Sequence, residues 1–438
     1  MSDLPFGFGP ASGDDDPEPV NPFGSLFGAG GPNDLGSALQ QIGKLLSYEG
    51  GPVNWDLARD TARQVVAAAG DASVSPPERR EVEEAVRLAE VWLDPVTALP
   101  AATSAALAWS RAEWVEQTLP TWRQLVDPLA ERVVDATATA VPAEMQAMAG
   151  PMLGMVRQLG GAMFGAQVGQ GIGALAGEVV GSTDVGLPLG PAGKAVLMPA
   201  NVRKFGEGLE VPADEVRLYL ALRECAHQRL FAHVPWLRSR LFAAVEDYAR
   251  GISIDTSRLE QTMGSIDPSN PQAIQEALQS GLFEPEDTPQ QQATLARLET
   301  LLALVEGWVD AVVTGASGAL PSAEAMRETL RRARATGGPA EQTFATLVGL
   351  ELRPRRLREA AALWTELAAA RGVDGRDAVW AHPDLLPTAE DLDDPAGFVA
   401  RTELSTSGFD LSELDGAGDA PEDPEMPHSP GSPGPDPE

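Results

Sequence analysis

The stretch Leu222–Phe231, with the sequence LRECAHQRLF, is the strongest indication of the fold in this chain. It lies in a helical pattern whose inward positions alternate at spacings of four and three, as in a helix facing a core. Those positions are Val216, Leu220, Arg223, His227 and Leu230. Two of the five are polar, and polar side chains cost free energy to bury unless they are paired. The pattern therefore predicts a helix with Arg223 and His227 one turn apart on its buried face and Glu224 beside them.

The spacing of these three residues matches the zinc-binding pattern HExxH except at its first position. In that pattern two histidines at i and i+4 face one zinc ion, and the glutamate at i+1 polarises the metal-bound water. Arg223 stands at the first histidine position, Glu224 at the base position and His227 at the second histidine position. A guanidinium stays protonated in proteins and offers no lone pair, so it does not ligate a cation. By itself, a Glu-x-x-His pair on a helix indicates such a site only weakly.

Composition excludes some classes of function. The chain has 438 residues and a formal net charge of −32. The negative electrostatic potential of such a chain repels nucleic acid and anionic lipid. No nucleic-acid partner is therefore expected. Cys225 is the only cysteine, which fits a reducing cytoplasm, and a small buried apolar role is expected for it rather than that of a catalytic thiol. Residues 1–16 lack the basic and apolar regions of a signal peptide, so a cytoplasmic location is predicted.

The rest of the chain predicts a mainly α fold with one short strand element, Ala195–Met198, just before the Arg223 helix. Residues 1–33 and 400–438 are rich in Gly, Pro and acidic residues, and we expect disordered tails on either side of a helical domain at 34–399. The helices expected within that domain are 35–46, 55–69, 75–93, 101–117, 121–138, 238–250, 295–313, 321–335, 341–350 and one from 353–358 to about 371, with a capping box at 388–391 before a last short helix.

Glycine recurs every fourth residue from Gly161 to Gly181, and residues 158–177 carry no charge. This length would span a bilayer, and small-xxx-small spacing is a transmembrane packing pattern. Three glutamines interrupt the segment, however, and glycine contributes little transfer free energy. A central helix or helix pair, with neighbouring backbones packed closely against it, is the preferred interpretation over a membrane span.

The motif Arg223–Phe231, followed by Val234–Leu237, resembles that of the zincin-like metallopeptidase family of actinobacterial hydrolases, one branch of which is associated with biosynthesis of a deazaflavin coenzyme. Leu304–Trp308 resembles the second motif of that family, and His382–Pro387 resembles its end. The resemblance covers roughly residues 35–399. It implies a mostly helical zincin-like fold, a zinc-dependent hydrolase activity and a peptide or protein substrate.

Carried over to this chain, the resemblance makes His227 a zinc ligand, Glu224 the general base and Glu306 the third ligand on a second helix. Asp310, one turn after Glu306, would orient a ligand histidine from behind. Two rivals for the third ligand remain, Glu246 ranked second and His233 third.

Arg223 is the departure from the family pattern, because a catalytic zinc normally has three protein ligands and a water. Its guanidinium could instead pair with Glu306 or Asp310 where the ion would lie. The sequence therefore leaves two interpretations open. One is a zinc-dependent hydrolase with a degenerate site, and the other is a catalytically inactive zincin-fold protein that binds a partner or acts as a scaffold.

Overall fold

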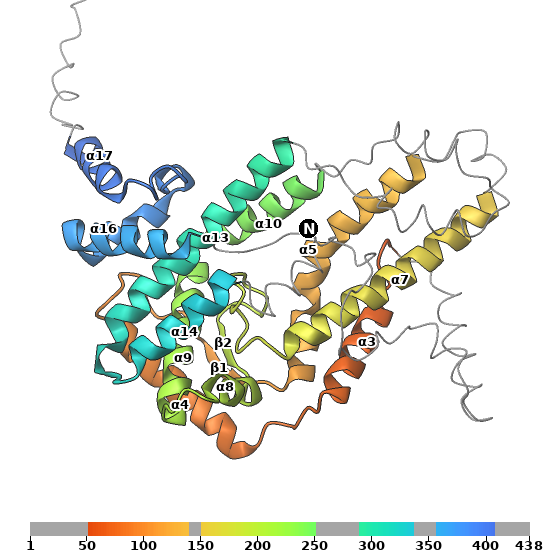
Figure 1. Cartoon of the computed structure of the whole chain (residues 1–438), viewed down its shortest axis with the longest axis horizontal. Coiled ribbons are helices and arrows are strands. Elements are labelled where there is room, and N and C mark those ends of the chain that lie inside the picture. Colours follow the sequence, from red (N-terminus) through yellow and green to blue (C-terminus); the bar gives the residue numbers. More distant parts are fainter. Residues whose placement is uncertain (1–50, 140–149, 251–288, 337–355, 408–438) are drawn as a thin grey trace, which may run out of the picture.

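The computed structural model describes residues 51–139, 150–250, 289–336 and 356–407, and these are mostly helical (Figure 1). Its main elements, in chain order, are α3 (Trp55–Ala68), α4 (Pro76–Leu93), β1 (Ala105–Ala108), α5 (Arg111–Thr139), α7 (Gly150–Ala176), β2 (Lys194–Leu197), α8 (Pro199–Gly206), α9 (Ala213–His233), α10 (Pro235–Arg250), α13 (Pro289–Ala316), α14 (Ala323–Thr336), α16 (Leu357–Asp377) and α17 (Pro395–Ser407).

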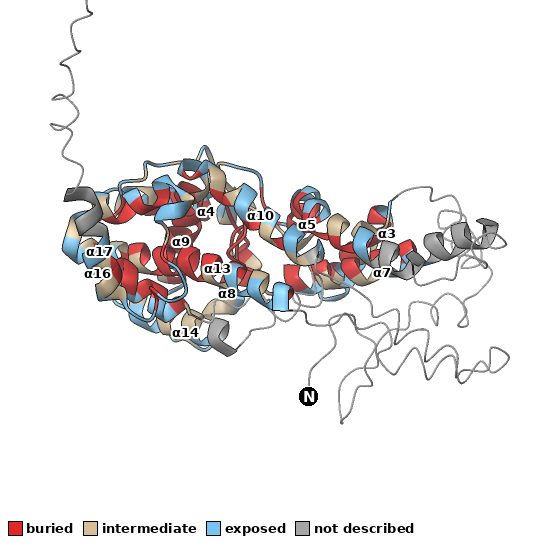
Figure 2. Ribbon diagram, turned by 90° about the horizontal axis from the view of Figure 1, so that it is seen from above, coloured by how far each residue is buried: buried red, intermediate tan, exposed pale blue. Residues whose placement is uncertain are grey.

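Helix α9 runs through the centre of the larger part of the molecule. Every residue from Leu218 to Leu230 is buried, so the helix is enclosed on all sides over three turns rather than amphipathic. It packs against α4, α8, α13, α14 and β2, which together surround it (Figure 2). The sequence predicted one inward stripe on this helix, but the apolar residues between the stripe positions allow it to be buried all round.

A two-stranded parallel sheet lies beside α9. Strand β1 pairs with β2 in the register Ala105–Lys194 to Ala108–Leu197, and β2 is the strand expected from the sequence. The predicted helix over 101–117 is wrong in its first half, because residues 105–108 form β1. The partner of β1 lies about 90 residues away along the chain, so no local sequence pattern indicates the pairing.

Most of the segment with glycine at every fourth residue belongs to α7, which ends at Ala176 and packs along α3 away from the body (Figure 1). A Cβ atom added at Gly165 would lie 2.4 Å from the carbonyl oxygen of Asn54, and one at Gly169 would lie 2.4 Å from that of Ala58. The glycine face therefore lets two helix backbones approach closely. This confirms the expected helix and its close packing against a neighbour, but the helix lies at the side of the molecule and not at its centre, where α9 lies.

One helical stretch in the described part of the chain, Pro289–Ala319, is long and apolar enough to cross a membrane, and 72% of its most apolar window is buried in the protein. It comprises α13 and the short 3-10 turn after it, and α13 packs against α9, α10 and α16. Its apolar character is therefore used to form the protein core.

Most other expected helices match α3, α4, α10, α13, α14 and α16 within a few residues. The two helices expected at 101–117 and 121–138 merge into α5, which continues through Pro120 and Pro128. The capping-box contacts between Thr388 and Asp391 form, but α17 begins four residues later, at Pro395, and continues to Ser407 past the expected boundary at 399. The helices expected at 35–46 and 341–350 lie outside the described residues.

Candidate functional site

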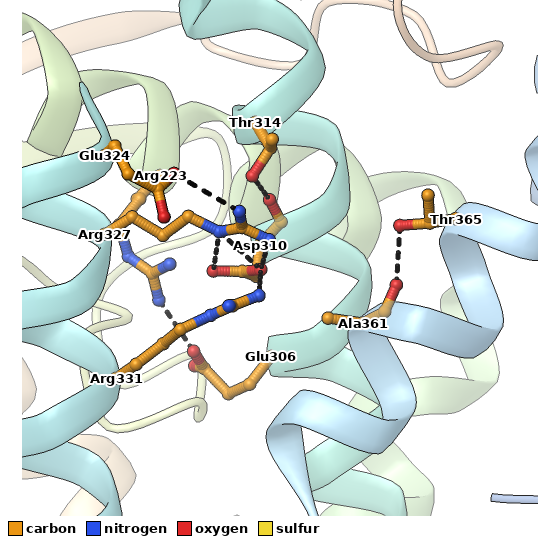
Figure 3. Close-up of polar contacts among 9 residues, drawn as sticks. All are labelled: Arg223, Glu306, Asp310, Thr314, Glu324, Arg327, Arg331, Ala361 and Thr365. Atoms are coloured by element: carbon orange, nitrogen blue, oxygen red, sulfur yellow. Dashed lines mark hydrogen bonds and ion pairs between the residues drawn. The ribbon is translucent and has the colours of Figure 1, made fainter.

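Arg223 on α9 and Glu306 on α13 form an ion pair in the protein core. The guanidinium Nη2 of Arg223 donates to the Oε2 atom of Glu306 at 2.7 Å (Figure 3). The side chains are 7% and 1% exposed, so the pair is almost completely removed from water. In the low-dielectric interior such a contact is strong, and it offsets the cost of burying both charges.

His227 lies against the other oxygen of the same carboxylate. Its Nε2 atom is 3.0 Å from Oε1 of Glu306, and its Nδ1 atom is 2.9 Å from the backbone oxygen of Arg223. Both oxygens are hydrogen-bond acceptors, so the two ring nitrogens of His227 lie against the backbone of α9 on one side and against Glu306 on the other. The ring also stacks on Phe231 one turn along α9, which fixes its plane. Glu306 therefore bridges Arg223 and His227, the two inward polar residues of the motif.

Glu224 faces a different wall, formed by β2 and the loop before it. Its carboxylate accepts hydrogen bonds from the Ser182 hydroxyl at 2.5 Å, the Thr183 hydroxyl at 2.6 Å and the Gln228 amide at 3.2 Å. It also accepts from the backbone N–H groups of Thr183 at 3.2 Å and Val196 at 3.3 Å. Five donors satisfy both oxygens, so Glu224 attaches α9 to the strand and its loop.

The loop before β2 approaches this carboxylate closely because Gly181 has no side chain. A Cβ atom there would lie 2.7 Å from Oε2 of Glu224 and 2.8 Å from the backbone oxygen of Val196. Gly186, with a φ of +76°, similarly lies against Glu306. Both glycines therefore bring loop backbone up to the two buried glutamates.

Asp310, one turn after Glu306 on α13, is held by two arginines of α14. Its Oδ2 atom accepts from Nη2 of Arg327 at 3.0 Å and from Nη2 of Arg331 at 2.6 Å (Figure 3). Asp310 is 3% exposed, whereas the arginine side chains are 20% and 17% exposed. The partners of Asp310 are therefore cations that anchor α14 to the core, not a histidine.

The charges around Arg223 keep its guanidinium protonated. Burial lowers the pKa of Arg223, but Glu306, with Tyr219, Asp310 and Asp184, raises it by more, and the resulting pKa lies above the ordinary value. Burial also raises the pKa of Tyr219 to about 12. At neutral pH Arg223 is charged and Tyr219 is a neutral phenol.

Little open space remains around these side chains. A cavity of about 10 Å³, lined by Asp184, Arg223, Glu224 and His227 among others, lies between α9 and the loop before β2. This volume suits about one water molecule. As formed by the described residues, this cavity is therefore too small to hold a substrate beside the Arg223–Glu306 pair.

The two rival ligands lie elsewhere. Glu246 is on the exposed face of α10, 3.7 Å from Arg250, and His233 contacts the backbone oxygen of Pro100 with its Nε2 atom at 3.0 Å. Cys225 is buried, and burial raises its pKa well above the ordinary value. Of the residues considered from the sequence, the structure brings Arg223, His227 and Glu306 into mutual contact.

The residues present do not fit a catalytic zinc ion. A catalytic zinc ion normally has three protein ligands, each of which supplies a lone pair. Arg223 has no lone pair to offer, and its N–H group instead donates to the Glu306 carboxylate, which would otherwise bind the ion. In the described part of the chain, no group of three or more His, Cys, Asp or Glu side chains is arranged to hold a metal ion. His227 and Glu306 are in contact with each other, and the Arg223 guanidinium is in contact with Glu306.

Several partners of the cluster were not identified from the sequence, among them Ser182, Thr183, Arg327 and Arg331. Ser182 and Thr183 lie in a loop with no recognisable pattern, and their contact with Glu224 spans about 40 residues. Arg327 and Arg331 are spaced i and i+4, and this spacing indicates that both lie on one face of α14.

Comparison with known proteins gives the context for this geometry. The profile of the zincin-like metallopeptidase family matches residues 53–399. The crystal structure of "a putative hydrolase with a novel fold" from Chloroflexus aurantiacus is similar, with a TM-score of 0.56 and 22% identity over 80% of this chain and 99% of that one. No curated protein matches. The match runs from just before α3 into α17, and the chain belongs to the zincin-like metallopeptidase family.

Proposed function

We propose that this chain is a non-catalytic member of its family, a binding protein in which the Arg223 guanidinium occupies the position of the metal. The observation that carries the proposal is the 2.7 Å contact between Arg223 and Glu306, with His227 on the other oxygen of the same carboxylate. These are the three positions that the family motif assigns to zinc. A permanent cation there neutralises the carboxylate without an ion.

The hydrogen bonding of Glu224 supports the same proposal. A general base needs a free lone pair aimed at the water that it activates. Both oxygens of Glu224 accept from donors of the loop and strand, among them the hydroxyls of Ser182 and Thr183. Glu224 acts here as a structural acceptor that positions α9 against β2.

Asp310 supports it further. In a zinc site this residue would orient a ligand histidine, but Arg327 and Arg331 bind it instead. Buried ion pairs add little net stability compared with apolar packing, yet losing one partner is costly. The two clusters therefore favour one specific arrangement of α9, α13 and α14.

The test uses the full chain, purified without chelator and without affinity nickel. The proposal predicts no zinc-dependent cleavage of a peptide library, scored by mass spectrometry, and the same melting temperature with and without EDTA. Zinc-dependent cleavage by the wild-type chain would contradict it.

A zinc-dependent hydrolase is the second candidate, favoured by the family assignment and by the contact between His227 and Glu306. That function requires Arg223 to leave the carboxylate and a further donor to enter. It predicts about one zinc per chain and a loss of hydrolysis in Glu224→Gln. It also predicts that Arg223→Ala strengthens zinc binding, because the competing cation is gone.

A further inference from the structure

A second and much larger cavity lies between α4, α8 and the first turn of α9, and both α4 and α8 pack against α9 (Figure 1). Its volume is about 400 Å³, well above the roughly 150 Å³ of an engineered cavity that binds one benzene ring. It shares no residue with the Arg223–Glu306 site, so an inference about it does not depend on the proposed function.

The floor of this cavity is apolar. Val82, Val202 and Val216 line it and are 1%, 5% and 1% exposed, and Pro199 and Val211 lie beside them. Small-molecule sites are usually concave, apolar and supplied with a few placed polar groups. The floor therefore suits the apolar body of a ligand.

The charged groups at the cavity are three glutamates and two arginines, a net charge of −1. Arg203 pairs with Glu78, and Arg217 pairs with Glu81 at 2.7 Å. Hydrogen bonds from Ser75, together with Arg203, lower the pKa of Glu78 to about 2. Both arginines are therefore already paired with glutamates.

Glu207 is the exception. Glu207 is exposed and lines the cavity, and its carboxylate has no hydrogen-bond or ion-pair partner among the described residues. An anionic head group would meet this carboxylate and the acidic first turn of α9, which carries Asp214 and Glu215. A cationic head group would find a free partner in Glu207, and the net charge of −32 would attract it to the protein.

The wall that carries Glu207 is held in a defined shape. In the turn between α8 and α9, Gly208 has a φ of +81° and Glu210 a φ of +51°, in the left-handed region that a non-glycine residue rarely adopts. The backbone N–H groups of Glu207 and Leu209 donate to the carbonyl oxygens of Lys204 and Gly206. The free carboxylate is therefore presented from a specific turn.

From this combination we infer that the cavity binds an amphipathic amine, with its apolar body on the valine floor and its ammonium group on Glu207. The ammonium donates to the carboxylate, and no covalent step is involved. The inferred ligand class is a primary amine with an aromatic or aliphatic body larger than one ring.

The test is isothermal titration calorimetry on the full chain with three probes that share one body: 4-phenylbutylamine, 4-phenylbutanol and 4-phenylbutanoate. We expect the amine to bind with one site per chain, the alcohol to bind about two- to fivefold more weakly, as expected for loss of a partly exposed ion pair, and the carboxylate to bind more weakly still. Equal affinity for the amine and the carboxylate, or no binding of any probe, would overturn the inference.

Two pairs of variants locate the site. Glu207→Gln should weaken amine binding about two- to fivefold, whereas Glu210→Gln, which removes the same charge from the same turn outside the cavity lining, should leave it unchanged. Ala213 is exposed and lines the cavity, so Ala213→Trp should block the probe without disturbing the core, whereas Ala174→Trp on exposed α7 should not. Equal losses in the two glutamate variants, or unchanged binding in Ala213→Trp, would overturn the assignment.

Discussion

Arg223 and Glu306 lie 83 residues apart in the chain and meet at 2.7 Å in its core, joining helices α9 and α13. Each is the other's charge partner in a region without bulk water, and His227 contacts the same carboxylate. Loss of either partner alone would leave a buried charge without its counter-charge, so it should cost more free energy than the intact pair contributes relative to apolar packing.

Arg223→Ala is expected to lower the free energy of unfolding by about 3–5 kcal/mol, because it leaves the Glu306 carboxylate buried without its cation. Replacing both partners by apolar residues, as in Arg223→Met with Glu306→Leu, should cost less than the sum of the single changes. Urea unfolding measures both. The control is Arg63→Ala, which breaks an exposed pair with Glu116 and should cost no more than about 1 kcal/mol. A neutral Arg223→Ala would contradict the buried-pair interpretation.

Asp310→Ala is expected to cost about 3–5 kcal/mol and to loosen α14, because Arg327 and Arg331 lose their shared acceptor. Arg327→Ala should cost less, since Arg331 still pairs with Asp310. Hydrogen exchange of residues 323–336 reads the local effect. Unchanged protection of α14 in Asp310→Ala would show that these ion pairs do not anchor the helix.

Gly169→Ala should destabilise the chain, because the new Cβ would lie 2.4 Å from the backbone oxygen of Ala58 and would push α3 away from α7. Gly160→Ala is the matched control on the same helix, where a Cβ meets nothing within 4 Å. It should stabilise the helix by up to about 1 kcal/mol, the difference in helix propensity between alanine and glycine. Thermal unfolding compares the two. Equal effects would contradict the close approach of the two backbones.

The lowered pKa of Glu78 should make the free energy of unfolding depend on pH. Hydrogen bonds from Ser75 and the charge of Arg203 lower its pKa from 4.5 to about 2, so the folded state binds this proton less readily than the unfolded chain. Its stabilising contribution is therefore complete above about pH 4.5 and is lost as the pH falls through about 2. The difference in unfolding free energy between the wild type and Glu78→Gln should shrink over that window. A difference that stays constant from pH 5 to pH 2 would contradict the lowered pKa.

The central helix and its polar face could be predicted from the sequence because their signals are local. The 4-3 spacing places Arg223 beside His227, and the apolar neighbours of Glu306 require it to have a partner. The contact between them follows from these two facts together with the family resemblance. The capped starts of α3 and α4, at Asn54 and Ser75, are equally local.

The remaining features depend on contacts between distant residues. Strand β1 exists because residues 105–108 pair with β2, and its sequence, AALA, has no strand preference of its own. The role of Glu224 depends on Ser182 and Thr183, in a loop whose path no pattern specifies. Glu224 matched a catalytic position in spacing, but the chain surrounds it with hydrogen-bond donors.

The most direct test of the account is the zinc content of two proteins purified without chelator or affinity nickel, measured by mass spectrometry after equilibration with zinc. We expect no bound zinc in the wild-type chain, because Arg223 pairs with Glu306. We expect about one zinc per chain in Arg223→His, which completes the HExxH pattern with Glu306 as third ligand. About one zinc in the wild type, lost in Glu306→Ala, or none in a folded Arg223→His, would contradict the claim that a guanidinium stands in the place of the metal.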